Sequence, residues 1–488
     1  MTPTLRRVAL AACLATGPLL VHAQAAPDAM TGAARRAIET NPDVSARLNA
    51  VRASLDAIEV VRGGRLPRVD AEAVIGRTDD RISTRAPQSG SLDRNGTALT
   101  ITQLLWDGNA LTQAVSRLDF ERQARWFELL DTTEQTALEA VRAYIDVLRM
   151  RRLVDLAEDS YVQHRYVFQQ IQSRVRAGVA RGVDLEQAGA RLALAESNLT
   201  TETANLHDVA SRYLRLVGEA PAQRPTRPTT LGTAMPTSSQ EAMALALRNS
   251  AAISAGIATL RSARAGAQER ESAFLPRVEA RLRAGAGRNF DGVPDQKHDV
   301  SAEVALNWNL FNGGSDQARV RQQTNLMNQA ADLRDKTCRD VRQTAAIAFN
   351  DVAKLTELIS ALDRNVLSIE KARDAYRQQF EIGQRSLLDL LNAENELYTA
   401  RRAYANADHD RLTAQARMLA AMHGLTPRLG LRAPMQATDA GVDSNWSAGE
   451  DMPARCPAVM LELMTTPRSE LDARAQRLIQ AAPPPPTR

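Results

Sequence analysis

The sequence is poor in aromatic residues and holds no block of like charges. Only 4% of its 488 residues are aromatic, and the abundance of Ala, Leu, Arg, Gln and Glu favours long helices over an aromatic-rich compact core. The 61 basic and 57 acidic residues leave a net charge of +4, and arginine is interspersed with Asp and Glu throughout. The charge pattern therefore gives no reason to expect a nucleic-acid partner.

Long hydrophobic runs are also missing after the first residues. A basic start at Arg6 and Arg7, an apolar run over 8–21 and small residues near Ala23 form the pattern of a secretory signal peptide over residues 1–23. No later stretch reaches the ~18 apolar residues that a membrane-spanning helix needs. An alternative is a lipoprotein signal ending at Cys13, but the apolar run before that cysteine is short. The chain is therefore expected to leave the cytoplasm.

Cysteine is scarce, with three residues in the whole chain. Cys13 is expected to leave with the signal peptide, so the mature chain keeps Cys338 and Cys456. Two cysteines so far apart in the sequence do not indicate a disulfide framework. The sequence therefore predicts an unpaired Cys338 within a helix and an unpaired Cys456 in the C-terminal tail.

Motifs that mark enzymes are absent as well. The sequence contains no Gly-rich phosphate loop, no HExxH helix and no GxSxG elbow. Its six histidines are dispersed, without pairs spaced four residues apart. The sequence therefore does not predict an enzyme, and it suggests no catalytic, cofactor-binding or metal-binding residue.

What the sequence does contain is an internal repeat with an offset of about 205 residues. GRLPRVDAEAV at 64–74 resembles AFLPRVEARLR at 273–283, and TQLLWDGNALTQA at 102–114 resembles NWNLFNGGSDQA at 307–318. Further along, GVARGVDLEQAGA at 178–190 is matched by GQRSLLDLLNAEN at 383–395, with Gly and Asp-Leu at the same spacing. Landmarks in one order at nearly one offset indicate two copies of one unit.

The repeat divides the chain into segments with the same predicted elements. After the signal peptide come a first unit over 24–219, a Pro/Thr-rich linker over 220–239, a second unit over 240–425 and a Pro/Ala-rich extension over 426–488. Each unit is predicted to contain an opening helix (31–62; 240–272), a β-hairpin (67–106; 276–311), a long helix (108–177; 313–382) and a return helix (184–216; 386–422). The turns from strand to long helix are predicted at Asp107, Gly108, Asn312 and Gly313.

The predicted strands alternate apolar and polar residues. In the second hairpin, Val300, Val304 and Leu306 alternate with Ser301 and Glu303, so one face is apolar and the other polar. One such alternation is typical of a half-buried strand in a soluble sheet. Four of them, in two matching hairpins behind a signal peptide, favour strands of an outer-membrane barrel with the apolar face outward.

The ends and the number of these strands point to the same environment. Trp106, Trp308 and Phe311 lie at strand ends, where an aromatic girdle meets a membrane interface. Four strands cannot close a transmembrane barrel, because the smallest bacterial barrels have about eight and open edges are not tolerated in lipid. The chain is therefore expected to oligomerise, and three copies would supply twelve strands.

The long helices predict the length of the molecule. From Gly108 to Gly178, and again from Gly313 to Gly383, the chain runs 70 residues without a proline. A continuous helix of that length rises about 105 Å. Its apolar residues recur at helical spacing, and a long amphipathic helix needs neighbours to bury such a stripe. The chain is expected to turn back at Gly178 and Gly383.

Taken together, these features resemble the TolC family of outer-membrane channel proteins. The resemblance runs from roughly residue 30 to 425 and is carried by the signal peptide, the twin units and the motifs NPDV (41–44), LPRV (66–69 and 275–278), LLWDGN (104–109), LFNGG (310–314) and GQRSLLDLLNAENELYTARRAYANADHD (383–410). It implies a mainly α fold with membrane β structure. The implied assembly is a homotrimer, whose twelve-stranded outer-membrane β-barrel continues as a long periplasmic α-helical barrel. Whether the extension over 426–488 is flexible or wraps the middle of the tunnel is left open.

The resemblance also implies a periplasmic aperture at the two glycine turns. Carried over by position, Asp389 lines the aperture and Arg385 ties it closed, while Asp184 is the acidic partner in the first unit, with Val183 beside it. An alternative role for Asp184 and Asp389 is that of an N-terminal helix cap or first-turn carboxylate. The two roles can coexist.

Two residues depart from the family pattern at this aperture. Asn392 stands where a second lining aspartate is often found, and Phe380 stands where a tyrosine is expected. Phenylalanine has no hydroxyl to donate, so a hydrogen-bonded lock at this position is expected to be weaker or absent. The missing carboxylate predicts a milder preference for cations.

Three functions remain open at this level. The first is a passive exit duct for type I secretion of a large polypeptide such as a toxin or an adhesin, working with a periplasmic adaptor, an inner-membrane ABC exporter and outer-membrane lipid. The second is the outer-membrane duct of a multidrug efflux pump, and the third is a periplasmic coiled-coil adaptor without a pore. Efflux members of the family often carry a convincing lipoprotein signal, so the weak one at Cys13 favours the first.

Overall fold

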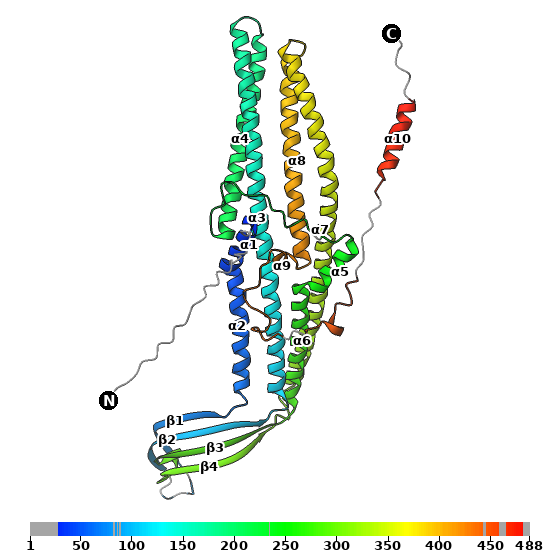
Figure 1. Ribbon diagram of the computed structural model, residues 1–488. Coiled ribbons are helices and arrows are strands. Elements are labelled where there is room, and N and C mark those ends of the chain that lie inside the picture. Colours follow the sequence, from blue (N-terminus) through cyan, green and yellow to red (C-terminus); the bar gives the residue numbers. More distant parts are fainter. Residues whose placement is uncertain are drawn as a thin grey trace, which may run out of the picture.

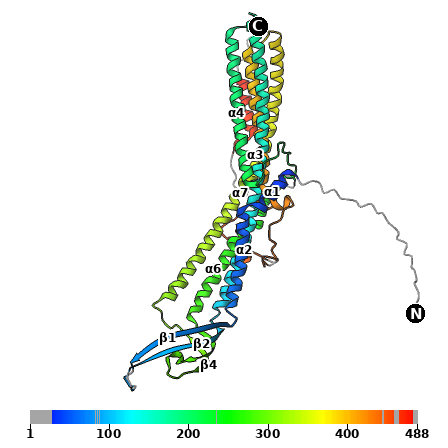
Figure 2. The same ribbon diagram turned by 90° about the vertical axis from the view of Figure 1, so that its left-hand side faces the viewer.

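The protein is an elongated molecule with a β-sheet at one end and two helical hairpins at the other (Figure 1). Figure 2 shows the same molecule from the side, with the helices continuing the long axis away from the sheet. The computed structural model describes residues 28–481, except residues 82, 85, 87, 88, 234, 443–445 and 458–464. The predicted signal peptide, with Cys13, lies outside the described residues.

The two repeats run through the same order of elements. The first contains α1 (Ala29–Thr40), α2 (Pro42–Gly63), β1 (Arg68–Arg81), β2 (Ser89–Trp106), α3 (Ala110–Arg176) and α4 (Gly182–Val217). The second contains α5 (Ser239–Asn249), α6 (Ala251–Glu271), η1 (Ser272–Phe274), β3 (Arg277–Arg288), η2 (Phe290–Gly292), β4 (His298–Asn307), α7 (Ser315–Glu381) and α8 (Leu387–Ala421). The C-terminal part adds α9 (Leu425–Arg428), η3 (Gly449–Asp451) and α10 (Arg468–Ala481).

The opening helix of each repeat is broken in two, where the sequence predicts one helix. Between α1 and α2, the side chain of Asn41 accepts a hydrogen bond from the backbone N of Asp43 at 2.8 Å. Between α5 and α6, the Ser250 hydroxyl accepts one from the backbone N of Ile253 at 3.2 Å. Each cap starts a new helix. Apolar spacing continues across both breaks, which is why the pattern alone predicts single helices over 31–62 and 240–272.

The long helices α3 and α7 are continuous over 67 residues each, a length of about 100 Å. Both begin after a left-handed turn, in which Gly108 has a φ of +66° and Gly313 a φ of +70°, a conformation that glycine adopts without a steric penalty. The Asp107 carboxylate accepts a hydrogen bond from the backbone N of Leu111 at 2.9 Å, and Asn312 occupies the matching position before α7. The turn is therefore built in the same way in both repeats.

The two hairpins form one antiparallel sheet in the order β1-β2-β3-β4. The register pairs Ile101 with Leu282, whereas the preceding residue, Thr100, pairs with Arg283. One face of the sheet is therefore apolar and the other polar, because side chains alternate along each strand. β4 ends at Asn307, so the hairpin is shorter than the predicted range to residue 311, and residues 308–311 follow the strand.

The main core lies at the middle of the molecule, where helices of both repeats meet the linker and the C-terminal segment. Its fully buried side chains include Leu129 and Ile145 of α3, Leu231 of the linker, Met418 of α8 and Leu425 of α9. Burial of this apolar surface holds the two repeats together. The linker is thus part of the core as well as a connection.

A buried carboxylate fixes the start of the C-terminal segment to the first repeat. Glu134 of α3 accepts hydrogen bonds from the backbone N atoms of Leu425 at 2.7 Å and Thr426 at 3.2 Å. The Thr426 hydroxyl donates to the same carboxylate at 2.5 Å. These donors compensate a charge that would be costly to bury alone.

Residues 425–457, which we call the C-terminal strap, pack against the middle of the helices. Trp446 lies edge-on to Phe127 of α3, with ring centroids 4.7 Å apart. The Asp451 carboxylate accepts hydrogen bonds from Arg261 at 2.8 Å and Arg264 at 3.0 Å, both on α6. Of the two alternatives left open for the extension, the structure shows wrapping in its described part up to residue 457.

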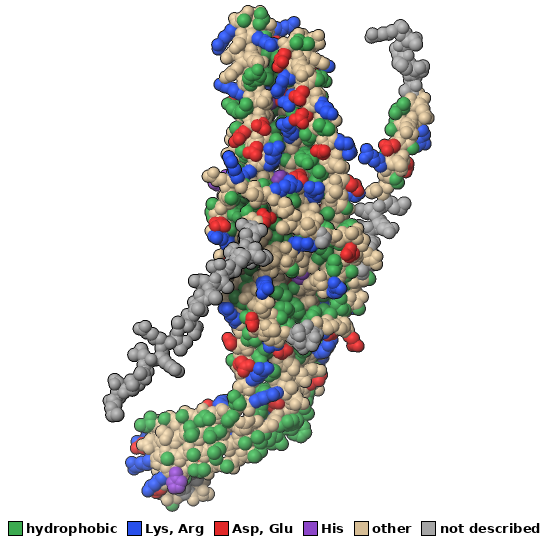
Figure 3. Space-filling model, viewed as in Figure 1, with side chains coloured by type: hydrophobic (Ala, Val, Ile, Leu, Met, Phe, Trp, Pro, Cys, Tyr) green, Lys and Arg blue, Asp and Glu red, His purple; other side chains and the backbone are tan. Residues whose placement is uncertain are grey.

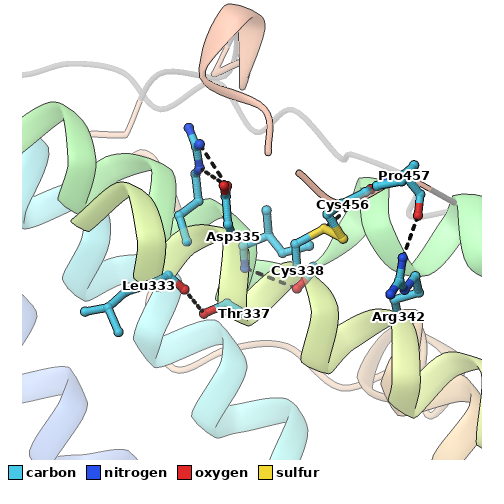
Figure 4. Close-up of a disulfide and its surroundings, with 10 residues drawn as sticks. Leu333, Asp335, Thr337, Cys338, Arg342, Cys456 and Pro457 are labelled. Atoms are coloured by element: carbon cyan, nitrogen blue, oxygen red, sulfur yellow. Dashed lines mark hydrogen bonds and ion pairs between the residues drawn. A yellow bond between two sulfur atoms is a disulfide. The ribbon is translucent and has the colours of Figure 1, made fainter. Parts of the chain in front are cut away.

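A disulfide joins Cys338 to Cys456, so the prediction that both cysteines are unpaired is wrong. The bond connects α7 to the strap, with the Cα atoms 6.0 Å apart. Beside it, Arg342 of α7 donates a hydrogen bond to the carbonyl O of Pro457 at 2.9 Å (Figure 4). The two cysteines are 118 residues apart, and only the course of the strap brings them together.

Beyond the strap, α10 is exposed along its length. The segments before and after it, 458–464 and 482–488, lie outside the described residues. Among the helices that the structure describes, none has by itself the length and apolar composition of a membrane span. One bent pair, Ser239–Asn249 with Ala251–Phe274, meets both criteria together.

The disulfide leads to a prediction about stability. We expect Cys456→Ser to lower the free energy of unfolding by about 2–4 kcal/mol, because a crosslink restricts the unfolded chain. Thermal unfolding followed by circular dichroism in detergent measures the change. Cys338→Ser should give the same shift, and a reductant should add nothing in either variant. Free thiols in the unfolded, unreduced wild type would contradict the assignment.

Candidate functional site

The two helical hairpins end in matching turns at the end of the molecule opposite the sheet (Figure 1). Gly178 between α3 and α4 has a φ of +73°, and Gly383 between α7 and α8 has a φ of +76°. In each turn the residue after the glycine donates its backbone N–H back into the helix: Val179 to the O of Arg174 at 2.9 Å, and Gln384 to the O of Gln379 at 2.8 Å. This is a Schellman-type helix end, which explains why glycine recurs at the offset of 205.

The second tip carries a compact set of polar contacts around Asp389. The Ser386 hydroxyl caps α8 by accepting a hydrogen bond from the backbone N of Asp389 at 3.2 Å, and it donates to the Asp389 carboxylate at 2.9 Å. Arg385 lies 3.6 Å from the same carboxylate. The hydrogen bond from Ser386 and the charge of Arg385 hold the pKa of Asp389 below its usual value. Asp389 thus takes part in the cap while remaining at the tip.

The aromatic partner of Arg385 is Tyr376, which the sequence did not single out. The guanidinium carbon of Arg385 lies 4.6 Å from the centroid of the Tyr376 ring, a cation–π distance, and its Nε donates to the side-chain O of Gln379 at 3.1 Å. Tyr376 lies one turn before Phe380 on α7. The two aromatic residues are spaced four residues apart on α7, and this spacing could have indicated Tyr376.

Phe380 instead packs inside the tip. Its side chain is buried in an apolar cluster with Val167 and Ile171 of α3 and Leu390 of α8, and Arg174 lies over its ring at 5.1 Å. Phe380 therefore joins the two hairpins through apolar contact. It lies apart from the contacts that hold Arg385.

The first tip lacks the polar set of the second. α4 begins at Gly182 after Arg181, without a side-chain cap. In the described part of the chain, the Asp184 side chain makes no hydrogen bond or ion pair, and it lies in the first turn of α4. Val183 beside it is 65% exposed. Asp184 is therefore a first-turn carboxylate and does not cap the helix, while its role at the aperture stays a prediction.

Below the tips, polar contacts join neighbouring helices, first between the two hairpins and then within the second hairpin. Arg191 of α4 donates to the side-chain O of Asn392 on α8 at 2.9 Å, so Asn392 faces the other hairpin. Further along, the buried Glu394 accepts hydrogen bonds from Arg373 at 3.2 Å and Arg377 at 2.6 Å. The arginines are spaced four residues apart on α7, a pattern that could have indicated a shared partner.

At the opposite end, the sheet presents its apolar face to the surroundings. Space-filling shows hydrophobic side chains covering much of the visible sheet (Figure 3). Val300 is 70% exposed, Val304 is 68% exposed and Leu306 is 62% exposed, and these residues alternate along one face of β4, so they form part of an exposed apolar face of the kind that marks an interaction surface. The aromatic residues Trp106, Trp308 and Phe311, at or just after the helix-proximal ends of the strands, are also exposed, and the Trp308 Nε1 donates to the carbonyl O of Phe274 at 3.0 Å.

Comparisons with known proteins agree with this architecture. A family model described as "Outer membrane efflux protein" matches residues 33–219 and 242–424, one match on each repeat. The chain is 24% identical over 429 residues to outer membrane efflux protein BepC of Brucella suis, covering 88% of this chain and 92% of BepC. It is 27% identical over 405 residues to alkaline protease secretion protein AprF of Pseudomonas aeruginosa, covering 78% of this chain and 82% of AprF.

A solved structure shows the same fold. The outer-membrane channel OprN superposes with a TM-score of 0.72 at 20% identity, over 81% of this chain and 90% of OprN. The apolar sheet fits the outer membrane, the long hairpins fit the periplasm, and the family model matches both repeats. The chain therefore belongs to the outer membrane efflux protein family, the family of TolC, and it is an outer-membrane channel protein that extends into the periplasm rather than an enzyme.

Proposed function

We propose that three copies of this chain form the outer-membrane exit duct of a type I protein secretion system. The observation that carries the proposal is a four-stranded sheet with an apolar outer face and two open edges, β1 and β4, joined to hairpins about 100 Å long. Three copies supply twelve strands, which pair the open edges and close a barrel in lipid. The hairpins of the three copies continue the barrel as a tunnel through the periplasm.

The partners follow from the passive nature of a duct. An inner-membrane ABC exporter supplies the energy, a periplasmic adaptor connects it to the hairpin tips, and the cargo is a large polypeptide such as a toxin or an adhesin. AprF, which is named for secretion of alkaline protease, supports the secretion branch. The third hypothesis, an adaptor without a pore, is set aside because the family consists of outer-membrane channels.

Drug efflux is the second candidate function. The observation that favours it is the name of BepC, an outer membrane efflux protein, at similar identity and with greater coverage of the chain. The geometry of a duct serves either purpose, since it transmits a solute without binding it tightly.

At the tips, we assign Asp389, Arg385 and Tyr376 to the closing of a periplasmic mouth. Arg385 is held at once by a carboxylate at 3.6 Å, by an amide at 3.1 Å and by an aromatic face at 4.6 Å. Each contact is modest at an exposed site, and together they restrict the arginine to one position. Three such arginines around a shared axis narrow the mouth.

A deletion strain separates secretion from efflux. We expect loss of the gene to retain a large polypeptide in the cell while leaving drug susceptibility unchanged, because the exit duct is the last step of export. Quantitative proteomics of the culture medium and minimum inhibitory concentrations measure the two outcomes. Unchanged secretion with increased drug susceptibility would contradict the secretion proposal and indicate drug efflux instead.

Substitutions at the second tip test the mouth. We expect Asp389→Ala and Arg385→Ser to raise the resting conductance of the reconstituted trimer in a planar bilayer, because the first removes a contact that holds Arg385 in place and the second removes Arg385 itself. A trimer that conducts no current in any variant would refute the channel.

The matched control is Ser386→Ala. It removes the cap hydroxyl, at a cost of about 0.5–2 kcal/mol in helix stability, and leaves both charges of the Arg385–Asp389 pair. Its conductance should stay closer to wild type than that of Asp389→Ala. If Asp389→Ala lowers thermal stability without raising conductance, Asp389 acts only in capping.

The lowered pKa of Asp389 predicts how the mouth responds to pH. A carboxyl whose pKa is lowered in the folded protein stabilises the folded state at pH values above its unfolded pKa. This stabilisation is lost as the pH falls through the folded pKa. We therefore expect resting conductance to be constant from neutral pH to about pH 5 and to rise only below 3.8, the usual value for aspartate. Asp389→Ala should lack this rise, and an equal rise in that variant would assign it to other carboxylates.

A further inference from the structure

On the polar face of the sheet, the aromatic ring of Phe290 is buried. Phe290 lies in the loop between β3 and β4, residues 289–297, and it is 4% exposed. Its ring lies over two glycines of neighbouring strands: a Cβ atom built at Gly96 would lie 2.3 Å from the ring, and one built at Gly285 would lie 2.2 Å from it. Side chains at these two positions would therefore displace the ring, so the glycines form its seat.

This seat lies on the face that turns away from lipid. Gly285 alternates with Ala284 and Ala286, and the register pairs Ala284 with Leu99 and Val300, both on the apolar face. An apolar face outward means that the opposite face lines the inside of a barrel. Phe290 is therefore an apolar side chain on the polar, inner face.

Polar contacts hold the loop in the same place. The Asp291 carboxylate accepts two hydrogen bonds from the guanidinium of Arg283, at 2.8 and 3.0 Å, and that guanidinium also lies 5.1 Å from the centroid of the Phe290 ring. The side-chain amide of Asn289 donates to the carbonyl O of Asp93 on β2 at 2.7 Å. The loop is thus fixed to both β2 and β3, and it folds back over the sheet.

The loop is at the end of the sheet remote from the helices (Figure 1). Because the helices occupy the periplasm, this end faces the outside of the cell. In the described residues, the loop is held by ring packing and a bidentate ion pair, whereas the periplasmic tip is held by contacts of Arg385. The two ends of the proposed passage are therefore held by different sets of contacts.

The geometry points to a second constriction at the outer end of the duct, formed by the β3–β4 loop and held inside the barrel by Phe290. The inference rests on the proposed trimer, in which three such loops surround one axis. Each loop narrows the exit as long as its ring stays on the glycine seat. Outward passage of a wide cargo requires the loops to leave their seats, and bulky solutes outside are excluded while the loops remain seated.

Conductance tests this constriction in a protein whose periplasmic mouth is already opened by Asp389→Ala and Arg385→Ser. In that parent we expect Phe290→Ala to raise single-channel conductance further, because the loop loses its anchor. Gly285→Ala should raise it as well, since the new methyl group displaces the ring while Phe290 itself is kept. Trimer formation on a native gel shows that each variant is assembled.

The matched control is Val293→Ala in the same parent. Val293 belongs to the same loop and is 52% exposed, so it removes an apolar side chain without touching the seat. Its conductance should equal that of the parent. Equal conductance in Phe290→Ala, Gly285→Ala and the parent would overturn the constriction, and a parent that does not conduct would overturn the duct and the constriction with it.

Chemical accessibility gives a second measurement that does not depend on the mouth. Ala98 on β2 is 6% exposed and borders the same small cavity as Phe290. We expect the thiol of Ala98→Cys to react slowly with a membrane-impermeant maleimide added from outside, and faster when Phe290→Ala is combined with it. Equal rates would show that the loop does not cover the inner face and would overturn the proposal.

Discussion

The assembly proposed for this protein depends on a sheet that cannot be stable alone in its environment. Among the described residues, its four strands leave the outer backbone groups of β1 and β4 without strand partners, and its apolar face carries exposed side chains such as Val300 and Val304. In hydrocarbon each unpaired backbone group is costly, which supports the proposed trimer, in which further copies pair the edges. In that trimer the closed sheet arranges the attached helical hairpins around one axis, and a passage along that axis follows.

The repeat produces two hairpins with the same backbone and different tips. Gly178 and Gly383 adopt the same left-handed conformation, and the turns return their N–H groups to the helix in the same way. The side chains then diverge: the second tip holds a capped, paired Asp389, whereas Asp184 in the first tip has neither contact in the described chain. Duplication therefore preserved the turn, and the contacts proposed to close the mouth belong to one repeat.

The two ends of the proposed passage use different physical interactions. At the periplasmic tip, an ion pair and a cation–π contact hold Arg385, and the ion pair weakens when Asp389 loses its charge. At the outer end, an aromatic ring occupies a seat of glycines, and the fit depends on shape. In the proposed duct, binding of an adaptor at the tips and arrival of cargo at the outer end would therefore act on the passage independently.

The sequence by itself determined the repeat, the alternating strands, the long helices and the glycine turns, because these follow from local periodicity and from backbone conformations that few residues adopt. Only the tertiary structure decided which distant side chains meet. Cys338 pairs with Cys456 because the strap returns to α7, and Arg385 meets Tyr376 while Phe380 turns into the hairpin core. Such contacts depend on how each helix is rotated about its axis and on the path of a segment that has no periodic pattern. The spacing of residues along the chain determines neither of these.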